Sequence, residues 1–432
     1  MASAIATHGH TGSLPDAPST ASRKAIIGVS VGNLLEWYDF GVYGFFAITM
    51  GKNFFAAGDP VASLLASFAV FGIGFVARPL GGFVMGFVAD KRGRRSAMMI
   101  TIMLMALGTL LIGIAPTYAT AGVLAPLILV AARLLQGFAT GGEWGTAAAF
   151  CVEWAPSGRR GLYGAMQQST GLFGIVVGST VAAVLSTLFS NAQIDEWGWR
   201  IPFLLGALIG PIGFWIRRTI AETPAFEAAN KMPQAHHAMQ WGPALRLFCL
   251  MAVTFAVTYT YLYYLPTFTQ KFGGLTRAES LWANVIAVTA FCVGVPFGGL
   301  LSDRVGRKPV LLVSNLLILL LSYPLMAAIV KYQSFAATLS IQVLLNLFFA
   351  LFAGAATVAY VEMFPTIIRL RWLSPTYNLA GVAFGAFAPY IATWLVVATG
   401  SPTSAVYFVL FSCVLATLAL VGMRETAHEP LR

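Results

Sequence analysis

Residues 86–95, Gly-Phe-Val-Ala-Asp-Lys-Arg-Gly-Arg-Arg, and residues 299–308, Gly-Leu-Leu-Ser-Asp-Arg-Val-Gly-Arg-Lys, share one pattern of Gly, Asp, Gly and paired cations. Each copy follows a long apolar run. A second pattern recurs at nearly the same separation: Glu-Trp-Ala-Pro at 153–156 with Arg160 after it, and Glu-Met-Phe-Pro at 362–365 with Arg369 after it. Two motifs repeated at almost one separation indicate that the chain is built from two duplicated, parallel halves.

The composition around these motifs is that of a membrane protein. The chain has 432 residues, of which 58% are hydrophobic and only 10% charged, whereas a soluble chain carries about 25% charge. Many apolar runs reach the roughly 20 residues that cross a bilayer as a helix. Backbone polar groups in lipid must form their hydrogen bonds within the protein, which allows only helices or closed barrels. These runs are too long and too uniformly apolar for barrel strands. The fold class predicted is therefore an all-α integral membrane bundle.

The apolar runs predict twelve transmembrane helices in two six-helix halves. The spans are expected at 25–50, 62–88, 97–116, 122–147, 162–189, 200–218, 246–270, 280–302, 309–330, 336–361, 375–398 and 403–423. The domain organisation that follows is a disordered tail at 1–24, a first half at 25–218, a polar linker at 219–245, a second half at 246–423 and a short tail at 424–432.

The basic residues fix the expected orientation. The net charge is +10, and most Lys and Arg residues fall in the tails, the linker and the loops on one side of the predicted bundle. Cytoplasmic loops carry this excess, so we expect both termini in the cytoplasm. The positive-inside rule therefore explains the net positive charge, and we expect no nucleic-acid partner. The four cysteines are scattered without metal-ligand spacing, and we expect no metal and no cofactor.

The first span, Val-Gly-Asn-Leu-Leu-Glu-Trp-Tyr-Asp-Phe-Gly-Val-Tyr-Gly-Phe-Phe at 31–46, carries two carboxylates, Glu36 and Asp39. Helix rise places both roughly 16–21 Å from the start of the span, and Arg133 at a similar depth in the fourth span. Arg78 lies deeper along the second span. An ionised side chain inside a bilayer costs at least a few kcal/mol, roughly, unless it is paired, hydrated or neutralised. These four charges are therefore the primary functional candidates.

Glu36 and Asp39 share one helix face, which Asn33 and Tyr43 extend. Two carboxylates in a low dielectric resist double ionisation, which suits a proton-coupling site, with Asp39 first and Glu36 second. Arg133 offers a planar fork for a substrate carboxylate. The alternative for these residues is a static ion pair. For Arg78 we weigh an anion relay on the inward path against simple support of helix packing near Pro79 and Gly81.

The repeated loops predict gates. Pairs formed between motif residues of the two halves would close the cytoplasmic side and break when it opens, although topogenic signalling alone is an alternative for the arginines. The predicted gate residues are Asp90, Arg94, Glu153, Arg160, Asp303, Arg307, Glu362, Arg369, Arg78 and Glu143.

The Gly-x-x-x-Asp-[Arg/Lys]-x-Gly-Arg-[Arg/Lys] loops resemble the signature of the major facilitator superfamily. The segments Asn-Leu-Leu-Glu-Trp-Tyr-Asp-Phe at 33–40, Arg-Pro-Leu-Gly at 78–81, Arg-Leu-Leu-Gln-Gly at 133–137 and Glu-Trp-Gly-Trp-Arg-Ile-Pro-Phe at 196–203 are similar to those of the metabolite:proton symporters. Segment 67–79 and the pair Gln167 and Gln168 look most like the citrate branch. One departure is Trp372 to Pro375, where the family has small residues, and it leaves the geometry of the loop before the eleventh span open.

The second half has no charge within its predicted spans and offers neutral polar groups. They are Tyr259, Tyr261, Tyr263, Tyr264, Asn284, Gln342, Asn346, Tyr377 and Asn378. We expect most to serve helix packing, and we place the tyrosines near Pro266 in an interfacial belt or an outer gate. The predicted substrate contacts are Arg133, Gln167, Gln168, Tyr43, Asn33, Tyr377 and Asn378.

The function predicted is proton-coupled import of a small organic anion by alternating access. The resemblance implies a citrate-like di- or tricarboxylate, a bacterial inner-membrane location, lipid as the surrounding medium and a monomeric state. The alternative substrate is a zwitterion such as proline or betaine, or a hydroxylated acid such as shikimate. Three other classes are weaker possibilities. The short tails argue against a non-transporting sensor, and the duplicated gating motifs argue against a channel. An intramembrane enzyme is disfavoured because no catalytic Ser/His, His-Glu-x-x-His or Cys/His constellation lies within a span.

Overall fold

The computed structural model describes residues 20–55, 58–92, 94–141, 143–153, 155–156, 158–218, 241–366, 368–429 and 431. Nearly all of these residues are helical. The first tail and the linker of the sequence prediction lie almost entirely outside the described residues.

The first half contains six predicted spans, several of them made of two consecutive helices. The elements are α1 (Thr20–Phe45), α2 (Ala47–Phe54), α3 (Pro60–Val76), α4 (Arg78–Arg92), α5 (Arg94–Ile114), α6 (Tyr118–Ala121), α7 (Leu124–Thr140), α8 (Glu143–Glu153), α9 (Arg160–Leu188), α10 (Asn191–Gln193), η1 (Ile194–Gly198) and α11 (Arg200–Arg218). The elements α6, α10 and η1 connect spans at one end of the bundle.

The second half repeats this plan with two π-helical interruptions. Its elements are α13 (Trp241–Val257), η2 (Thr258–Tyr264), α14 (Leu265–Phe272), α15 (Arg277–Val305), α16 (Arg307–Tyr332), α17 (Phe335–Glu362), α18 (Arg369–Ala380), η3 (Gly381–Ala386), α19 (Ala388–Thr399), η4 (Pro402–Val406) and α20 (Tyr407–Val421). Within the described part, nine helices are long and apolar enough to cross a membrane, and Leu124–Thr140 and Arg200–Trp215 are shorter apolar helices.

The segment from Trp372 to Pro375, whose geometry the sequence left open, is helical. Both residues lie inside α18, and the Trp372 ring packs edge-on against Trp241 with centroids 5.3 Å apart. The helix therefore continues through this segment, and the bulky ring seals α18 against the start of α13.

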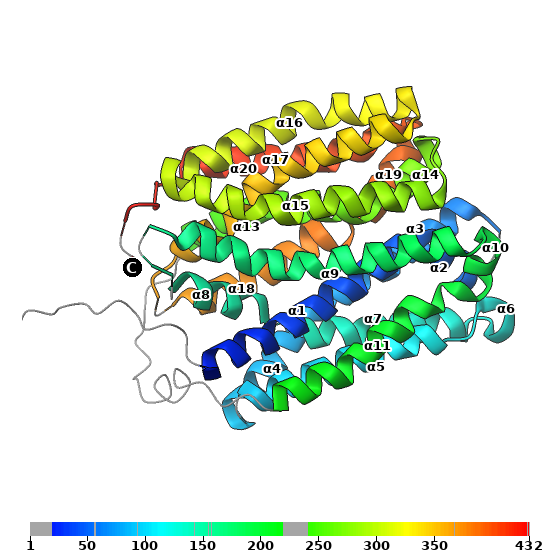
Figure 1. Cartoon of the computed structure of the whole chain (residues 1–432), viewed down its shortest axis with the longest axis horizontal. Helices are drawn as coiled ribbons and strands as arrows, with labels where there is room; N and C mark the ends of the chain where they lie inside the picture. The colour runs from blue at the N-terminus through cyan, green and yellow to red at the C-terminus, as the bar shows by residue number, and fades with distance from the viewer. Residues whose placement is uncertain are drawn as a thin grey trace, which may run out of the picture.

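Figure 1 shows the two halves lying against each other, with α9 of the first half beside α15 of the second. Glycines make this seam tight: a Cβ on Gly161 would lie 2.4 Å from the backbone oxygen of Gly299. The Ser169 hydroxyl also donates to the Cys292 carbonyl across the seam. The long axis of the bundle runs between a basic end, which carries the repeated loops and residues 424–429, and an opposite end, which carries α6, α10 and the start of α15.

Close helix contact also positions the two buried arginines. A Cβ on Gly137 of α7 would lie 1.6 Å from the backbone oxygen of Gly74 of α3, and one on Gly81 of α4 would lie 1.8 Å from that of Phe138. Only glycine allows backbones this near. Arg78 and Arg133 are thereby held on two helices in direct contact.

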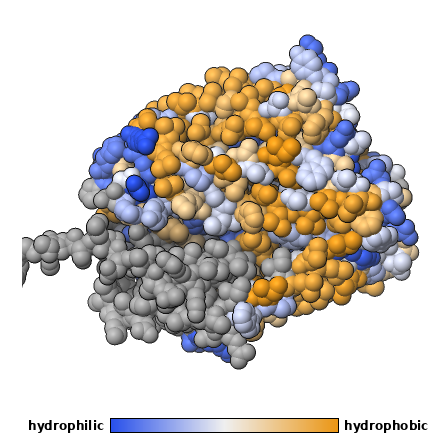
Figure 2. Space-filling view, in the orientation of Figure 1, coloured by the Kyte–Doolittle hydropathy of each residue, from blue (hydrophilic) through white to orange (hydrophobic). Residues whose placement is uncertain are grey.

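The surface has the distribution expected in a bilayer. Figure 2 shows apolar residues covering the middle of the visible face, with polar residues gathered towards the two ends. Large apolar side chains on different helices are exposed, among them Leu208, Val305 and Leu418. An apolar band of this kind is the surface that a bilayer-spanning helical bundle presents.

Candidate functional site

Asp39 and Arg133 form an ion pair within the first half. Oδ2 of Asp39 lies 3.3 Å from Nη1 of Arg133, and both side chains are fully buried. The Thr109 hydroxyl of α5 donates to Oδ1 of Asp39 at 2.7 Å. Arg133 donates to Gln136 at 2.9 Å, and Gln136 donates to Thr109 at 3.0 Å. Four side chains from α1, α5 and α7 thus close a ring of hydrogen bonds with no exposed member.

Glu36 and Arg78 form a second pair, one helical turn from the first. Oε1 of Glu36 lies 3.0 Å from Nη2 of Arg78, and the Glu36 side chain is 13% exposed. Glu36 has further contacts besides this one. The two neighbouring carboxylates of the sequence prediction therefore each have an arginine, and they differ in burial. This separation favours different roles for the two pairs.

Aromatic rings surround both arginines. The Cζ atom of Arg78 lies 4.8 Å from the Phe40 centroid and 4.1 Å from that of Phe75. The Cζ atom of Arg133 lies 4.4 Å from the same Phe40 centroid and 4.6 Å from that of Tyr43. Among described residues, Nε of Arg78 and Nε and Nη2 of Arg133 have no hydrogen-bond acceptor. Each guanidinium thus keeps donor capacity that its carboxylate does not use.

The second half meets this site with aromatic side chains from η2 and α18. Tyr259 packs edge-on against Phe75 at 5.2 Å and Tyr263 packs against Phe71 at 6.1 Å. Tyr377 lies close enough to interact with the Arg78 guanidinium. The tyrosines of η2 are all buried, so the prediction of an interfacial belt is wrong. The π-helical turn widens the helix here, and such turns recur at functional sites.

The remaining predicted substrate residues fall into two groups. Tyr43 donates its hydroxyl to the Ser67 carbonyl at 3.1 Å, and its ring lies under Arg133, so it belongs to the site. Gln167 is buried, and its Oε1 has no donor among described residues. Asn33 accepts from Trp37 within α1, a local contact that leaves it apart from the charged pairs.

Gln168, Tyr377 and Asn378 form a contact between the halves. The Trp144 indole donates to Gln168 at 3.2 Å and stacks on Tyr377 with centroids 4.3 Å apart. The Asn378 amide donates to the Gly141 carbonyl at 2.8 Å. These residues lie between the charged pairs and the basic end.

Predicted gate residues at the basic end join the two halves. Asp303 accepts the backbone N–H groups of Gly161 and Leu162 at 2.8 and 3.0 Å, so it caps the start of α9 from the other half. Arg369 pairs with Glu153, and Arg160 lies 3.5 Å from Glu362. The glutamate of each copy of the Glu–Pro–Arg pattern therefore pairs with the arginine of the other copy.

Arg307 links these contacts within the second half. Its guanidinium lies 2.7 Å from Asp303 and 3.4 Å from Glu362. The corresponding residues of the first half are Asp90 and Arg94, which lie on α4 and α5. Their side chains, and that of Glu143 on α8, lie outside the described part of the structure.

Residues 424–429, predicted as a tail, form a strap over these ion pairs. Glu425 accepts the backbone N–H groups of Arg307 and Lys308 at 2.8 and 3.0 Å. Although burial opposes it, these and two further backbone donors hold the pKa of Glu425 below its usual value. Thr426 donates to Glu362, and Arg160 donates to the Glu429 carbonyl. The strap therefore touches charged groups of both halves.

A second set of ion pairs, here called the Asp195 clasp, joins elements at the opposite end of the bundle. The sequence interpretation missed it. Asp195 of η1 accepts Arg277 of α15 at 2.7 Å, Lys52 of α2 at 2.7 Å and Thr49 at 2.9 Å. Arg277 begins the second half's α15, so the contact bridges the halves. An Asp beside Glu196 in a predicted loop is typical of solvated charge. Only the position of Asp195 between two predicted spans could have marked it as a contact residue.

The Asp195 carboxylate stays ionised to lower pH than an ordinary aspartate does. Partial burial would raise the pKa of Asp195, but Lys52 and Arg277 outweigh it and hold the pKa below the usual aspartate range. A carboxylate with a lowered pKa stabilises the folded contact above its ordinary pKa and loses that contribution only as pH falls through the lowered value.

In the described residues, no group of three or more His, Cys, Asp or Glu side chains is arranged to hold a metal ion. The four cysteines are free.

Comparisons with known proteins agree with this architecture. The chain matches the family described as "Sugar (and other) transporter" over residues 25–246 and "Major Facilitator Superfamily" over residues 247–432. A citrate-proton symporter of Klebsiella pneumoniae is 36% identical over 400 residues, which is 91% of this chain and 90% of that protein. A proline/betaine transporter of Escherichia coli (strain K12) is 35% identical over 430 residues, which is 95% of this chain and 85% of that protein.

A solved structure shares the fold. The xylose transporter from E. coli in a partially occluded inward-open conformation matches with a TM-score of 0.77 at 17% identity, covering 96% of this chain and 100% of that one. At this identity the likeness bears on the fold alone. With two duplicated six-helix halves, gate motifs in both and relatives at this level of identity, the chain belongs to the major facilitator superfamily of membrane transporters.

Proposed function

We propose that the protein is a proton-coupled symporter that imports a small organic carboxylate. The observation that carries this proposal is the pair of buried arginines, each matched to one carboxylate and each retaining unused donors. A permanently neutral site would need no such charges, and their burial costs free energy unless function retains them. The curated relatives named above are symporters or transporters of small carboxylates, which supports the same assignment.

Asp39 is the proposed proton carrier. It is fully buried, and its partners Arg133 and Thr109 are arranged to hold its ionised form. Protonation of Asp39 would remove the negative charge that holds Arg133, and the Arg133 fork would then be free to bind a carboxylate. The proton and the substrate thus bind together. The proton neutralises the Asp39 carboxylate, and the substrate carboxylate takes its place beside Arg133.

Glu36 and Arg78 are the proposed substrate-facing pair. Glu36 is the more exposed carboxylate, and the second half meets Arg78 through Tyr377. By the same exchange, protonation of Glu36 would release Arg78. Of the two roles weighed for Arg78, anion binding is the one proposed here, and support of helix packing is the alternative.

Charge counting limits the substrate. Among described residues within the spans, two arginines face two carboxylates, so each bound proton frees one arginine for one substrate carboxylate. A monocarboxylate therefore needs one proton and a dicarboxylate needs two. A tricarboxylate such as citrate would have to enter with its third carboxyl group protonated. We accordingly propose a di- or tricarboxylate carried with at least two protons.

A zwitterionic substrate is the second candidate, and a specific observation supports it. Phe40, Phe75 and Tyr259 place ring faces and edges around the Glu36–Arg78 pair. Aromatic rings attract ammonium groups by cation–π interaction. A betaine-like solute would then set its carboxylate on an arginine and its cation against the rings, with one proton carried.

The proposed transport cycle uses the ion pairs at both ends of the bundle. The basic end would lie in the cytoplasm of a bacterial inner membrane, as the Lys and Arg distribution supports. Opening to that side requires the Glu153–Arg369 and Arg160–Glu362 pairs to separate, while the Asp195 clasp stays closed. Rocking of two parallel repeats about a central site has this form. We propose that the monomer suffices, because the site lies within one chain.

Uptake into proteoliposomes under an imposed pH gradient tests the proposal. The panel is radiolabelled citrate, succinate, shikimate, proline and glycine betaine, with proton flux recorded by an internal pH dye. We expect gradient-driven accumulation of at least one acid, with two or more protons per citrate or succinate, or one per betaine. If nothing on the panel accumulates or competes, the proposed substrate class is wrong.

A further inference from the structure

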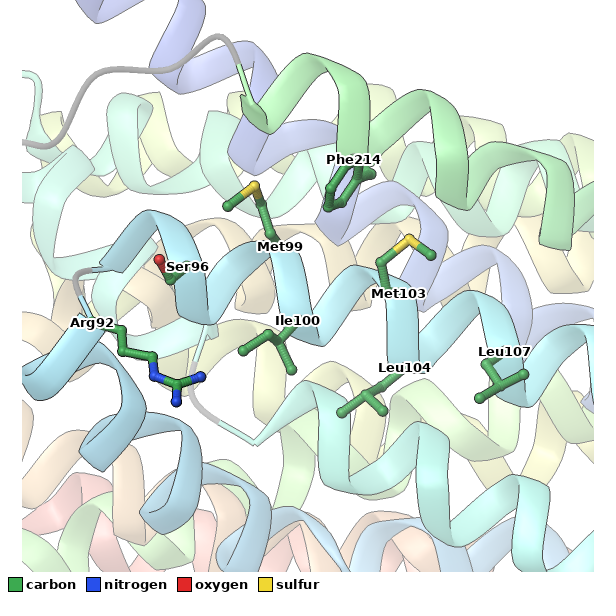
Figure 3. A pocket seen from close by; sticks show the side chains of 8 residues that line it. All are labelled: Arg92, Ser96, Met99, Ile100, Met103, Leu104, Leu107 and Phe214. Carbon is green, nitrogen blue, oxygen red and sulfur yellow. The ribbon is translucent and has the colours of Figure 1, made fainter.

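A groove on the flank of the first half has features that ordinary lipid contact does not require. Its volume is about 500 Å³, which lies within the range of roughly 300–1,000 Å³ typical of small-molecule sites. It is lined by Arg92, Ser96, Met99, Ile100, Met103, Leu104, Leu107 and Phe214. Figure 3 shows six of these residues following one another along α5, with Arg92 of α4 at one end and Phe214 of α11 beside Met99 and Met103.

The groove opens to the lipid-facing surface of the bundle. Met103 and Leu107 of its wall are 45% and 47% exposed, and both lie within the apolar membrane span that begins at Ser96. Nearby on α11, Trp215 is 69% exposed. The medium in contact with this wall is therefore the acyl region of the bilayer.

The length of the groove equals one leaflet. Ser96 and Leu107 are separated by about 16 Å along the helix axis. Half of a bilayer hydrocarbon core is about 15 Å. The apolar wall thus begins at the basic end of α5 and stops near the middle of the membrane, which is the span of one acyl chain.

A cation without a partner stands at the mouth of the groove. Arg92 ends α4 and is exposed, and within the described part of the chain it makes no ion pair. The adjacent Lys91 differs, because its ammonium group lies 4.4 Å from the Phe87 centroid. The Ser96 hydroxyl at the start of α5 adds a donor beside Arg92. A guanidinium and a hydroxyl at headgroup depth match a phosphate group.

We propose that this groove binds one anionic phospholipid of the leaflet at the basic end, with its phosphate on Arg92 and one acyl chain along Met99, Met103 and Leu107. The proposal rests on the cytoplasmic orientation given above, because the cytoplasmic leaflet is the one rich in anionic lipid. The bound lipid fills the seam between α5 and α11 and is retained after the annular lipids are washed away.

The test counts lipids on the purified full-length protein by native mass spectrometry. The protein is equilibrated in micelles with equal amounts of dioleoyl-phosphatidylglycerol and dioleoyl-phosphatidylcholine. We expect one retained phosphatidylglycerol on the wild type. Arg92→Gln should lower its occupancy about tenfold, the loss expected for one direct hydrogen bond to a charged group. Lys91→Gln, the matched loss of a neighbouring charge, should leave occupancy unchanged.

Met103→Trp provides an independent arm, because a bulky ring in the groove should reduce retention of both lipids. Equal retention of the two lipids by the wild type would overturn the proposal. So would an unaltered Arg92→Gln protein, or equal losses in the Arg92→Gln and Lys91→Gln proteins, which indicate diffuse surface charge. The readout is bound lipid in micelles and not transport, so its failure is separate from failure of the proposed function or of the orientation.

Discussion

The guanidinium groups of Arg78 and Arg133 lie against one aromatic ring. Their Cζ atoms are 4.8 and 4.4 Å from the centroid of Phe40, which stands one residue after Asp39. The two cations repel each other, and the shared ring gives both a favourable partner that is not a carboxylate. Phe40 thus keeps the two ion pairs close together while leaving the arginine forks available for exchange.

Replacing Phe40 with Leu should therefore weaken substrate binding. A cation–π contact is worth roughly 0.5–2 kcal/mol, so we expect the KM for uptake to rise by about twofold to thirtyfold through misplacement of both arginines. Initial uptake rates across substrate concentrations measure this. Phe40→Tyr retains the ring and is the control. Equal KM values for the Leu and Tyr proteins would show that the ring has no such role.

Thr109 is expected to tune the pH dependence of transport. Its hydroxyl donates to Oδ1 of Asp39 at 2.7 Å and so favours the ionised carboxylate. In Thr109→Val, Asp39 should bind its proton more readily, and half-maximal uptake should shift to higher pH. The measurement is the pH profile of initial uptake with the internal pH fixed. Thr109→Ser keeps the hydroxyl and should retain the wild-type profile, whereas an unshifted Val profile would exclude this influence.

Asp195 is expected to hold the end opposite the basic loops closed. In Asp195→Asn the bonds to Lys52 and Arg277 lose their charge, so that end should open more often. A cysteine introduced at the fully buried Asn284, in a background free of native cysteines, should then react at least several times faster with a membrane-impermeant maleimide. Glu196→Gln removes the adjacent exposed carboxylate and is the matched control. Equal labelling rates in both proteins would contradict the gate assignment.

Glu425 is expected to stabilise closure of the basic end. It accepts backbone N–H groups of Arg307 and Lys308, and the strap continues to Glu362 and Arg160. Glu425→Ala should loosen these contacts and raise labelling of a cysteine placed at the buried position Ala165, measured in inside-out vesicles. Arg424→Gln, a change in the neighbouring exposed residue, should have no effect. A strap that only fills space would leave the labelling rates of the two variants equal.

Much of this architecture is predictable from the sequence, because long apolar runs and duplicated loop motifs depend on local residue patterns. The positions of Glu36, Asp39, Arg78 and Arg133 within spans are also local information. Their pairing is not: the assignment of Arg78 to Glu36 and of Arg133 to Asp39 depends on glycine contacts between α3, α4 and α7 that no spacing rule supplies.

The misplaced and missed features have the same origin. The position of Tyr259 and Tyr263 near the outer end of a span predicts an interfacial belt or an outer gate, whereas a π-helical turn directs them to the seam between the halves. Asp195 lies in a short connecting segment and Glu425 in the segment that follows α20, and both sequences resemble solvated loops. Their partners are distant in sequence, so only the folded chain reveals them.

The central claim is that Asp39 carries the coupled proton by exchange with Arg133, and the Asp39→Asn protein tests it most directly. Reconstituted in liposomes, this protein should lose substrate accumulation driven by a pH gradient while retaining counterflow of labelled against unlabelled substrate, because asparagine, like protonated Asp39, leaves Arg133 free to bind the substrate carboxylate. Gradient-driven accumulation equal to that of the wild type, with proton flux intact, would contradict the account.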